Sequence, residues 1–369
     1  MKLVRIFSTL FTIAISMATI ASALSGYVDP SNWWFISITG LVFIPLVFLN
    51  AMVFMAWLFI DRKASIIPLT ALLISLIKLP LVAQFGGKDG PLEKGIDNPN
   101  QLKVVSFNVR LFDLYNWSNS EKTRQEIFQL IKEMDPDVVC FQEFFDSKSR
   151  GLDNIHDIKL LLDMPYHHTA YSITKFTSDH YGIATFSKYP ILNKEVITSS
   201  KKSTNLSIFS DIKVGADTIK VINCHLQSIR FNANDYAFLE DPTNASTPKH
   251  QISKTFNILK RMKKAYSFRS EQAKKISEVI KNSNHKIIVC GDFNDTPLSY
   301  TYQTISDQLN DSFTFGGKGM GQTYAGPLPG LRIDYILYDD HFSIKHFKTH
   351  NHKKLSDHYP LEAVLEIRP

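Results

Sequence analysis

Residues 286–297 read KIIVCGDFNDTP, an apolar and mostly β-branched run that ends at a glycine and a group of polar residues. This pattern predicts a buried strand followed by a turn that presents oxygen and amide groups. Asp292 and Asn294 alternate along an extended chain, so both side chains are expected on the same side. Taken alone, the stretch is also typical of a hydrophobic strand that ends in an ordinary Asx-rich turn.

Similar apolar runs occur on both sides of this stretch, and amphipathic helices are interspersed among them. Strands are expected at 103–109, 137–143, 181–187, 206–212, 218–226, 333–338 and 361–367, and helices at 121–134 and 270–281. The alternation of helices with strands, together with a hairpin around residues 214–217, predicts an α/β layered fold with mixed sheets.

Polar residues recur at the ends of these expected strands. They are Asn108, Glu143, His225, Asp292, Asn294, Asp334, Asp357 and His358. Each has a structural explanation by itself, such as a turn cap for Asn108 or a buried core histidine for His225. Their repetition predicts that the strand ends converge on one site.

The residue types at these strand ends suit phosphoester hydrolysis. Carboxylate and amide oxygens without a Cys/His cluster favour Mg²⁺ or Mn²⁺ over zinc. Two histidines and spare carboxylates can transfer protons and stabilise a phosphoryl transition state. The three cysteines, Cys140, Cys224 and Cys290, lie in apolar runs and are expected to be buried rather than to form disulfides or a metal site.

From Leu102 to the C-terminus the chain resembles the endonuclease/exonuclease/phosphatase superfamily, which includes DNase I, abasic-site exonucleases, neutral sphingomyelinases and inositol-polyphosphate phosphatases. The resemblance rests on six motifs in the family's order: SFNVR at 106–110, FQE at 141–143, NCHL at 223–226, GDFND at 291–295, RIDYIL at 332–337 and SDHYP at 356–360. It implies a four-layer α/β sandwich in which two mixed β-sheets are flanked by helices.

The resemblance also implies a metal site. Glu143 would bind the divalent metal, Mg²⁺ or Mn²⁺, with Asn108 beside it and Asp357 near it.

The same resemblance implies the catalytic roles. Asp292 would orient or activate the attacking water, Asn294 would hold the phosphate, and His225 would donate to the phosphoryl oxygens. His358, oriented by Asp334, would act as general base or as a transition-state donor. The sequence leaves open whether the base is Asp292 or His358.

The first 85 residues contain three apolar runs, at about 6–24, 34–60 and 64–85, which are interpreted as transmembrane helices. The third run contains Lys78 and two prolines, so an interfacial or re-entrant segment is the alternative. Basic residues before the first run and after the second predict that these two ends face the cytoplasm. The third run would then cross the membrane once more and place the large domain outside. A signal-peptidase site at residues 21–23 is an alternative interpretation of the first run. Residues 86–100 are expected to be a linker, followed by a catalytic domain over 101–369.

Charge bears on the substrate. Residues 1–85 and the remainder each carry a net charge of +3, so the domain is not an obvious polyanion binder. Residues 249–275, however, contain nine Lys or Arg and a single acid, Glu271. This segment is either a basic lobe that faces nucleic acid or anionic lipid headgroups, or a solvated helix pair.

Three functions are compatible with the sequence. The first is a membrane-anchored phosphodiesterase acting on a lipid headgroup or another extracytoplasmic phosphoester, and tethering favours it slightly. The second is a membrane-tethered nuclease for DNA or RNA. The third is a catalytically idle, membrane-bound binding module. Membrane lipids around the N-terminal spans and a phosphoester substrate are the expected partners.

Overall fold

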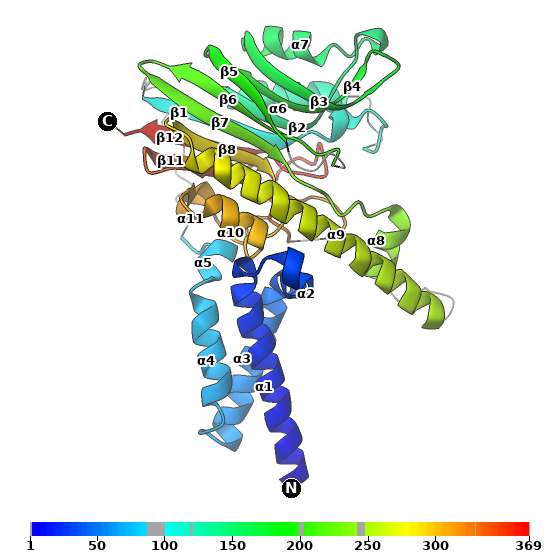
Figure 1. Ribbon diagram of the computed structural model, residues 1–369, viewed down its shortest axis with the longest axis vertical. Helices are drawn as coiled ribbons and strands as arrows, with labels where there is room; N and C mark the ends of the chain where they lie inside the picture. Colours follow the sequence, from blue (N-terminus) through cyan, green and yellow to red (C-terminus); the bar gives the residue numbers. More distant parts are fainter. Residues whose placement is uncertain are drawn as a thin grey trace.

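The computed structural model describes residues 2–86, 100–118, 120, 122–198, 203–241, 248–328 and 330–368. A layered α/β domain lies at one end of the molecule, and a group of helices from the N-terminal segment projects from it (Figure 1). Most of the expected linker, residues 87–99, lies outside the described residues.

The described residues of the domain form two six-stranded mixed sheets. The first has the order β11 (Phe342–Thr349), β12 (Leu361–Ile367), β1 (Gln101–Asn108), β2 (Val138–Asp146), β4 (Asp179–Ser187) and β3 (Tyr166–Lys175). The second has the order β5 (Ile191–Ile197), β6 (Ser207–Val214), β7 (Asp217–His225), β8 (Lys286–Asp292), β10 (Asp334–Tyr338) and β9 (Asn310–Asp311). Two parallel pairs, β1 with β2 and β7 with β8, lie at the centre of the sheets.

Each sheet has an apolar inner face and an apolar outer face, because successive strand residues point to opposite sides. Val104 and Ile288 pack in the cluster between the sheets, whereas their neighbours Val105 and Val289 pack outward. The helices α6 (Thr123–Met134) and α7 (Asn154–Leu161) cover the first sheet, and α9 (Pro248–Lys281) and α10 (Tyr300–Ser306) cover the second. The expected sandwich of two mixed sheets flanked by helices is confirmed.

Two polar side chains join the sheets inside this core. Gln142 on β2 donates through Nε2 to Oδ1 of Asn223 on β7 at 2.7 Å, and Asn223 donates to the carbonyl of Ala184 at 2.9 Å. Both side chains are fully buried, and an unpaired amide N–H there would be costly; Oε1 of Gln142 has no hydrogen-bond partner among the described residues. The bond therefore fixes how the ends of β2 and β7 lie opposite each other, which positions the residues that follow them.

Gly291 shows why a glycine precedes the polar turn of β8. Its φ is +129°, and a Cβ atom there would lie 2.0 Å from the carbonyl oxygen of Cys224 on β7. Only glycine combines this backbone angle with so close a strand approach. Cys224 itself is buried and forms no disulfide, like Cys140 and Cys290, as the sequence predicted.

The N-terminal segment differs from the expected three long helices. Two helices are long and apolar enough to cross a membrane, α1 (Lys2–Leu24, continued to Tyr27) and α3 (Phe43–Ile60). In each of them, only 17% of the apolar window is buried inside the structure. The third apolar run forms the eleven-residue helix α4 (Ile66–Leu76) and, after a break, the single turn α5 (Leu79–Val82).

The expected helix over 34–60 is also interrupted. It divides at Val42 into α2 (Pro30–Leu41) and α3, and α2 packs both on α1 and on α9 of the catalytic domain. Gly40 allows this close packing, since a Cβ atom there would lie 2.7 Å from Oγ of Ser25.

Several buried contacts join the N-terminal segment to the domain. Ser25 donates to the carbonyl of Leu298 at 2.7 Å, and Arg332 donates to the carbonyl of Leu81 at 2.8 Å while it pairs with Asp311. These bonds lie among apolar side chains of both parts. The domain is therefore seated directly on the ends of the N-terminal helices.

Candidate active site

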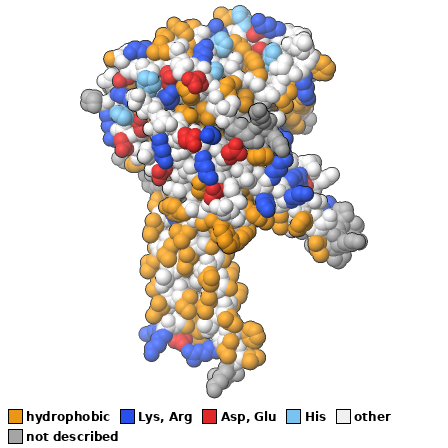
Figure 2. Space-filling model, viewed as in Figure 1, with side chains coloured by type: hydrophobic (Ala, Val, Ile, Leu, Met, Phe, Trp, Pro, Cys, Tyr) orange, Lys and Arg blue, Asp and Glu red, His pale blue; other side chains and the backbone are white. Residues whose placement is uncertain are grey.

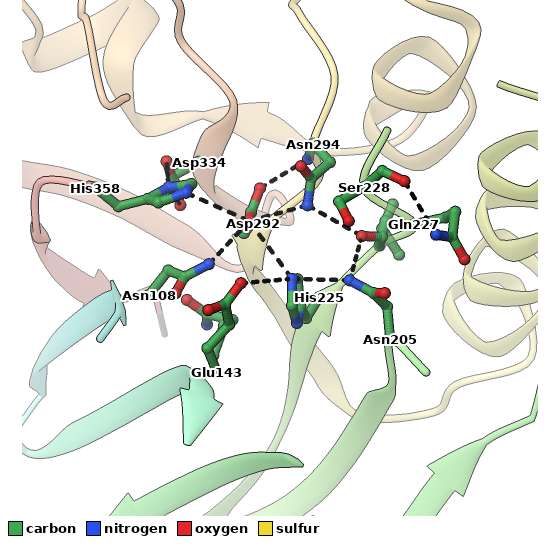
Figure 3. Close-up of polar contacts among 12 residues, drawn as sticks. Asn108, Glu143, Asn205, His225, Gln227, Ser228, Asp292, Asn294, Asp334 and His358 are labelled. Atoms are coloured by element: carbon green, nitrogen blue, oxygen red, sulfur yellow. Dashed lines mark hydrogen bonds and ion pairs between the residues drawn. The ribbon is translucent and has the colours of Figure 1, made fainter. Parts of the chain in front are cut away.

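Three of the predicted site residues form one row across the second sheet. In the strand register, Asp292 at the end of β8 lies beside His225 at the end of β7 and beside Asp334 at the start of β10. The row faces the ends of β1 and β2, where Asn108 and Glu143 stand (Figure 3). The convergence follows from the register of a parallel pair and an antiparallel pair that share β8.

His358 completes the row from the loop before β12. Its Nδ1 lies 2.9 Å from Oδ2 of Asp334, and its Nε2 lies 3.7 Å from Oδ2 of Asp292. Burial alone lowers the pKa of His358, but the nearby carboxylates of Asp334 and Asp292 outweigh burial and raise this pKa well above its ordinary value. The imidazole is thus oriented by Asp334 and held as a proton donor.

Asp292 lies at the centre of the site and is almost fully buried. Its Oδ2 accepts hydrogen bonds from Nδ2 of Asn108 at 3.0 Å and from Nδ2 of Asn294 at 3.0 Å. Its Oδ1 accepts a hydrogen bond from the backbone N–H of Asn294 at 2.8 Å. Burial raises the pKa of Asp292 to about 7, and the negative charge of Asp334 adds to the shift. A carboxylate with such a pKa can accept a proton near neutral pH.

His225 lies between this carboxylate and Glu143. Its Nε2 is 3.7 Å from Oδ2 of Asp292, 3.8 Å from Oε1 of Glu143 and 2.8 Å from Nδ2 of Asn205. Burial lowers the pKa of His225 to about 3, and the positive charge of His358 contributes to the same shift. His225 is therefore a neutral imidazole at physiological pH, whereas His358 is charged.

Glu143 occupies a bulge near the end of β2. The pairing of β2 with β4 shifts register between Phe141 and Phe144, and Glu143 adopts a left-handed φ of 49°. Such a conformation is uncommon in a strand and turns the side chain toward the site. Desolvation, followed by the negative charge of Asp357, raises the pKa of Glu143.

These oxygen donors fit a divalent cation. Glu143 and Asp292 both carry a raised pKa, chiefly because of burial, and each has a carboxylate oxygen within 4 Å of Nε2 of His225. Among the described residues, one group of three acids or histidines, formed by Asp292, Asp334 and His358, has ligand atoms within 4.8 Å of one another. Carboxylate and amide oxygens are the ligands that hard cations prefer.

The structure adds residues for which the sequence analysis predicted no role. Asn205, just before β6, bonds both His225 and the carbonyl of Leu226, and Arg110 approaches Oδ2 of Asp357 at 3.4 Å. Tyr324 packs edge-on against the His358 ring, with the ring centroids 5.4 Å apart. Arg110 was inside a quoted motif, whereas nothing in the local sequence distinguishes Asn205 or Tyr324.

The second aspartate of the GDFND motif has a different position from the first. Asp295 points away from the row and pairs with the buried Arg269 of α9 at 2.9 Å, while Thr301 donates to it at 2.9 Å. The pair fastens the turn after β8 to α9. Asp295 is thus part of the support of the site, and Asp292 is part of the site.

A profile of the endonuclease/exonuclease/phosphatase family matches residues 105–248 and 267–358. The chain therefore belongs to this family of metal-dependent phosphoester hydrolases. A second profile, for a domain of unknown function, matches residues 3–80. A search of curated proteins found no match to the chain.

Solved structures show the same fold at low sequence identity. The human Nocturnin catalytic domain, solved with a bound sulfate anion, is 17% identical with a TM-score of 0.51, over 74% of this chain and 96% of that one. Family proteins from Leptotrichia buccalis and Bacteroides vulgatus are each 17% identical with TM-scores of 0.49; the matches cover 72% and 73% of this chain and 100% and 99% of theirs. The likeness to the Nocturnin domain concerns the fold alone, in the part of the chain that follows the N-terminal helices.

Proposed function

We propose that the protein is a membrane-anchored phosphodiesterase that uses Mg²⁺ or Mn²⁺ and acts outside the cytoplasm on a lipid headgroup or a similar phosphoester. The observation that carries the chemistry is the row of His225, Asp292 and Asp334, completed by His358, opposite Glu143. This arrangement places a proton acceptor (Asp292), a charged donor (His358) and a neutral imidazole (His225) around one site.

In this mechanism Asp292 accepts the proton of the attacking water, because three hydrogen bonds hold its carboxylate and its pKa is about 7. His358, kept charged by Asp334, donates to the phosphoryl group or to the leaving oxygen. Glu143 and Asn108, with Asp357 nearby, would hold the cation, which when bound offsets the negative charge of the phosphate.

Anchoring is supported by the placement of charge along the helices. Arg5 pairs with Asp61, and Arg62 and Lys63 follow, so the positive residues gather at the end of α1 and α3 that lies far from the domain (Figure 2). On the face shown in Figure 2, the coloured side chains between that end and the domain are apolar. Basic residues mark the cytoplasmic end of a span, and α4 with α5 would then complete a third crossing.

This orientation predicts the behaviour of reporter fusions. Alkaline phosphatase fused after Asn100 should be active, because the enzyme folds only outside the cytoplasm. The matched control is a fusion after Lys63, in the basic loop between α3 and α4, which should be inactive. The reverse pattern, with a cytoplasmic reporter active after Asn100, would refute the proposed orientation.

The lipid substrate is favoured by two observations. The domain is seated on the ends of the apolar helices through bonds such as Ser25 to Leu298, so its substrate would be met at the bilayer. The net charge of only +3 after residue 85 is small for a protein that binds a polyanion.

The deciding experiment compares substrates with the full chain in detergent and Mg²⁺ or Mn²⁺. Vesicles of sphingomyelin or phosphoinositide should release headgroup while plasmid DNA stays intact, and the His358→Ala variant should release none. DNA cleavage that His358→Ala abolishes would instead establish a tethered nuclease. Failure of the purified chain on every phosphoester, with either metal, would support the idle binding module.

A further inference from the structure

Beside the site, two helices form an arm that projects from the sandwich (Figure 1). The arm consists of α8 (Ala233–Glu240) and the first part of α9, residues 248–268. Phe238 of α8 packs against Ile258, Met262 and Tyr266 of α9 in one buried cluster. The family profile matches residues 105–248 and then residues 267–358, so the match is interrupted over most of this part of α9. Most of the α9 part of the arm therefore lies outside the match to the family profile, whereas α8 lies inside it.

One face of α9 is directed toward the N-terminal segment. Lys274 and Ser270 both bond Asp29, and the Lys263 ammonium lies 5.9 Å from the centre of the Trp34 ring. Residues three, four or seven positions apart share a helix face. This face therefore continues along the arm from Lys263 to Phe256 and then to Ile252.

Phe256 and Ile252 are large apolar residues that remain uncovered. Their exposed fractions are 69% and 71%, respectively. Because they continue the face that packs on α2, they point toward the side of the molecule on which the apolar helices α1 and α3 project. Trp33 on α2 is 57% exposed at the same junction, and tryptophan is typical of the membrane–water boundary.

The charge of the arm complements an anionic surface. Residues 251–268 contain five basic side chains and no acidic one: Lys254, Lys260, Arg261, Lys263 and Lys264. Arg261 is paired with Asp235 of α8, while Lys260, Lys263 and Lys264 are exposed. Exposed apolar residues flanked by lysines characterise helices that lie in the headgroup region of a bilayer.

We propose that the arm rests on the anionic lipid surface beside the membrane spans, with Phe256 and Ile252 among the headgroups and the exposed lysines against lipid phosphates. This inference rests on the proposed anchoring of the chain. The arm also contacts the site, because the hydroxyls of Tyr236 on α8 and Tyr324 lie 3.0 Å apart and Tyr324 packs against His358. Contact with lipid would thus position the rim of the site at the bilayer.

The test places a fluorophore at Phe256→Cys in the full chain, reconstituted in nanodiscs whose lipids carry a quencher at the headgroup. The three native cysteines are buried. Quenching should be at least about twofold stronger with phosphatidylglycerol present than with phosphatidylcholine alone. The Lys260→Gln, Lys263→Gln, Lys264→Gln triple variant should lose that difference.

Two further labels separate this inference from the anchoring. Phe59→Cys on α3, 85% exposed, reports the span, and Phe176→Cys between β3 and β4, 82% exposed, reports a remote surface. If the label at 59 is strongly quenched while the labels at 256 and 176 are equally weakly quenched, the proposed role of the arm would be overturned and the anchoring would stand. Absence of quenching at 59 would overturn the anchoring and the inference together. Protection of the label at 256 by single-stranded nucleic acid, with no response to phosphatidylglycerol, would assign the arm to nucleic acid and also overturn it.

Discussion

Replacing Asp292 with asparagine is expected to lower kcat by about 10³-fold or more, because the change removes the proposed proton acceptor while keeping the size of the side chain. Asn108 and Asn294 now donate to this carboxylate at 3.0 Å each, and the amide oxygen of asparagine can still accept one of these bonds. Single-turnover kinetics with the best substrate of the vesicle assay would measure the loss.

The same variant should fold at least as stably as the parent in metal-free buffer. The pKa of Asp292 is about 7 in the folded chain, above the ordinary value of 3.8. Its contribution to stability is therefore present below about pH 4 and is lost as the pH rises through 7. Asparagine carries no charge to desolvate, so the melting temperature at pH 8 should equal or exceed that of the parent. A variant that is both unfolded and inactive would refute this account.

Replacing Glu143 with glutamine is expected to raise the metal concentration for half-maximal activity by roughly 10²-fold or more, since a neutral amide binds a hard cation more weakly than a carboxylate. The side chain is 38% exposed, so little packing is lost and the fold should persist. A metal titration of turnover, beside circular dichroism of the same sample, would measure both quantities.

Glu133→Gln is the matched control, because Glu133 is an exposed glutamate on α6 outside the site. It should leave the titration unchanged. Unchanged metal dependence in Glu143→Gln as well would refute the assignment of Glu143 as a ligand of the cation. The experiment therefore tests the metal assignment separately from the role of Asp292.

The strands that were predicted from the sequence are more deeply buried than those that were not. The central strands β1, β2, β7 and β8 are buried on both faces and appear as continuous apolar runs. The strands β3, β5 and β11 were not predicted, and each lies at the edge of a sheet. β5 shows the reason, because its middle residues are all exposed and its sequence carries neither an apolar run nor a clear alternation.

The predicted site residues converge because their positions follow from strand register. Asp292 was recognisable as a strand end, and so was Asp334, but only the pairing of β8 with β10 makes them neighbours. The motif gave no indication that Asp295 supports the site through a buried ion pair. This role of Asp295 was therefore not predicted. It depends on Arg269, which reaches Asp295 from a distant turn of α9.

By itself, the sequence determined the family, the central strands and the set of polar residues at their ends, because these depend on local patterns of burial and on motifs. Only the tertiary structure decided that α2 packs on α9, and that the basic segment forms an arm on which Phe256 is exposed. Both features depend on contacts such as those of Asp29 with Ser270 and Lys274. Partners more than 200 residues apart leave no periodic signal in the chain.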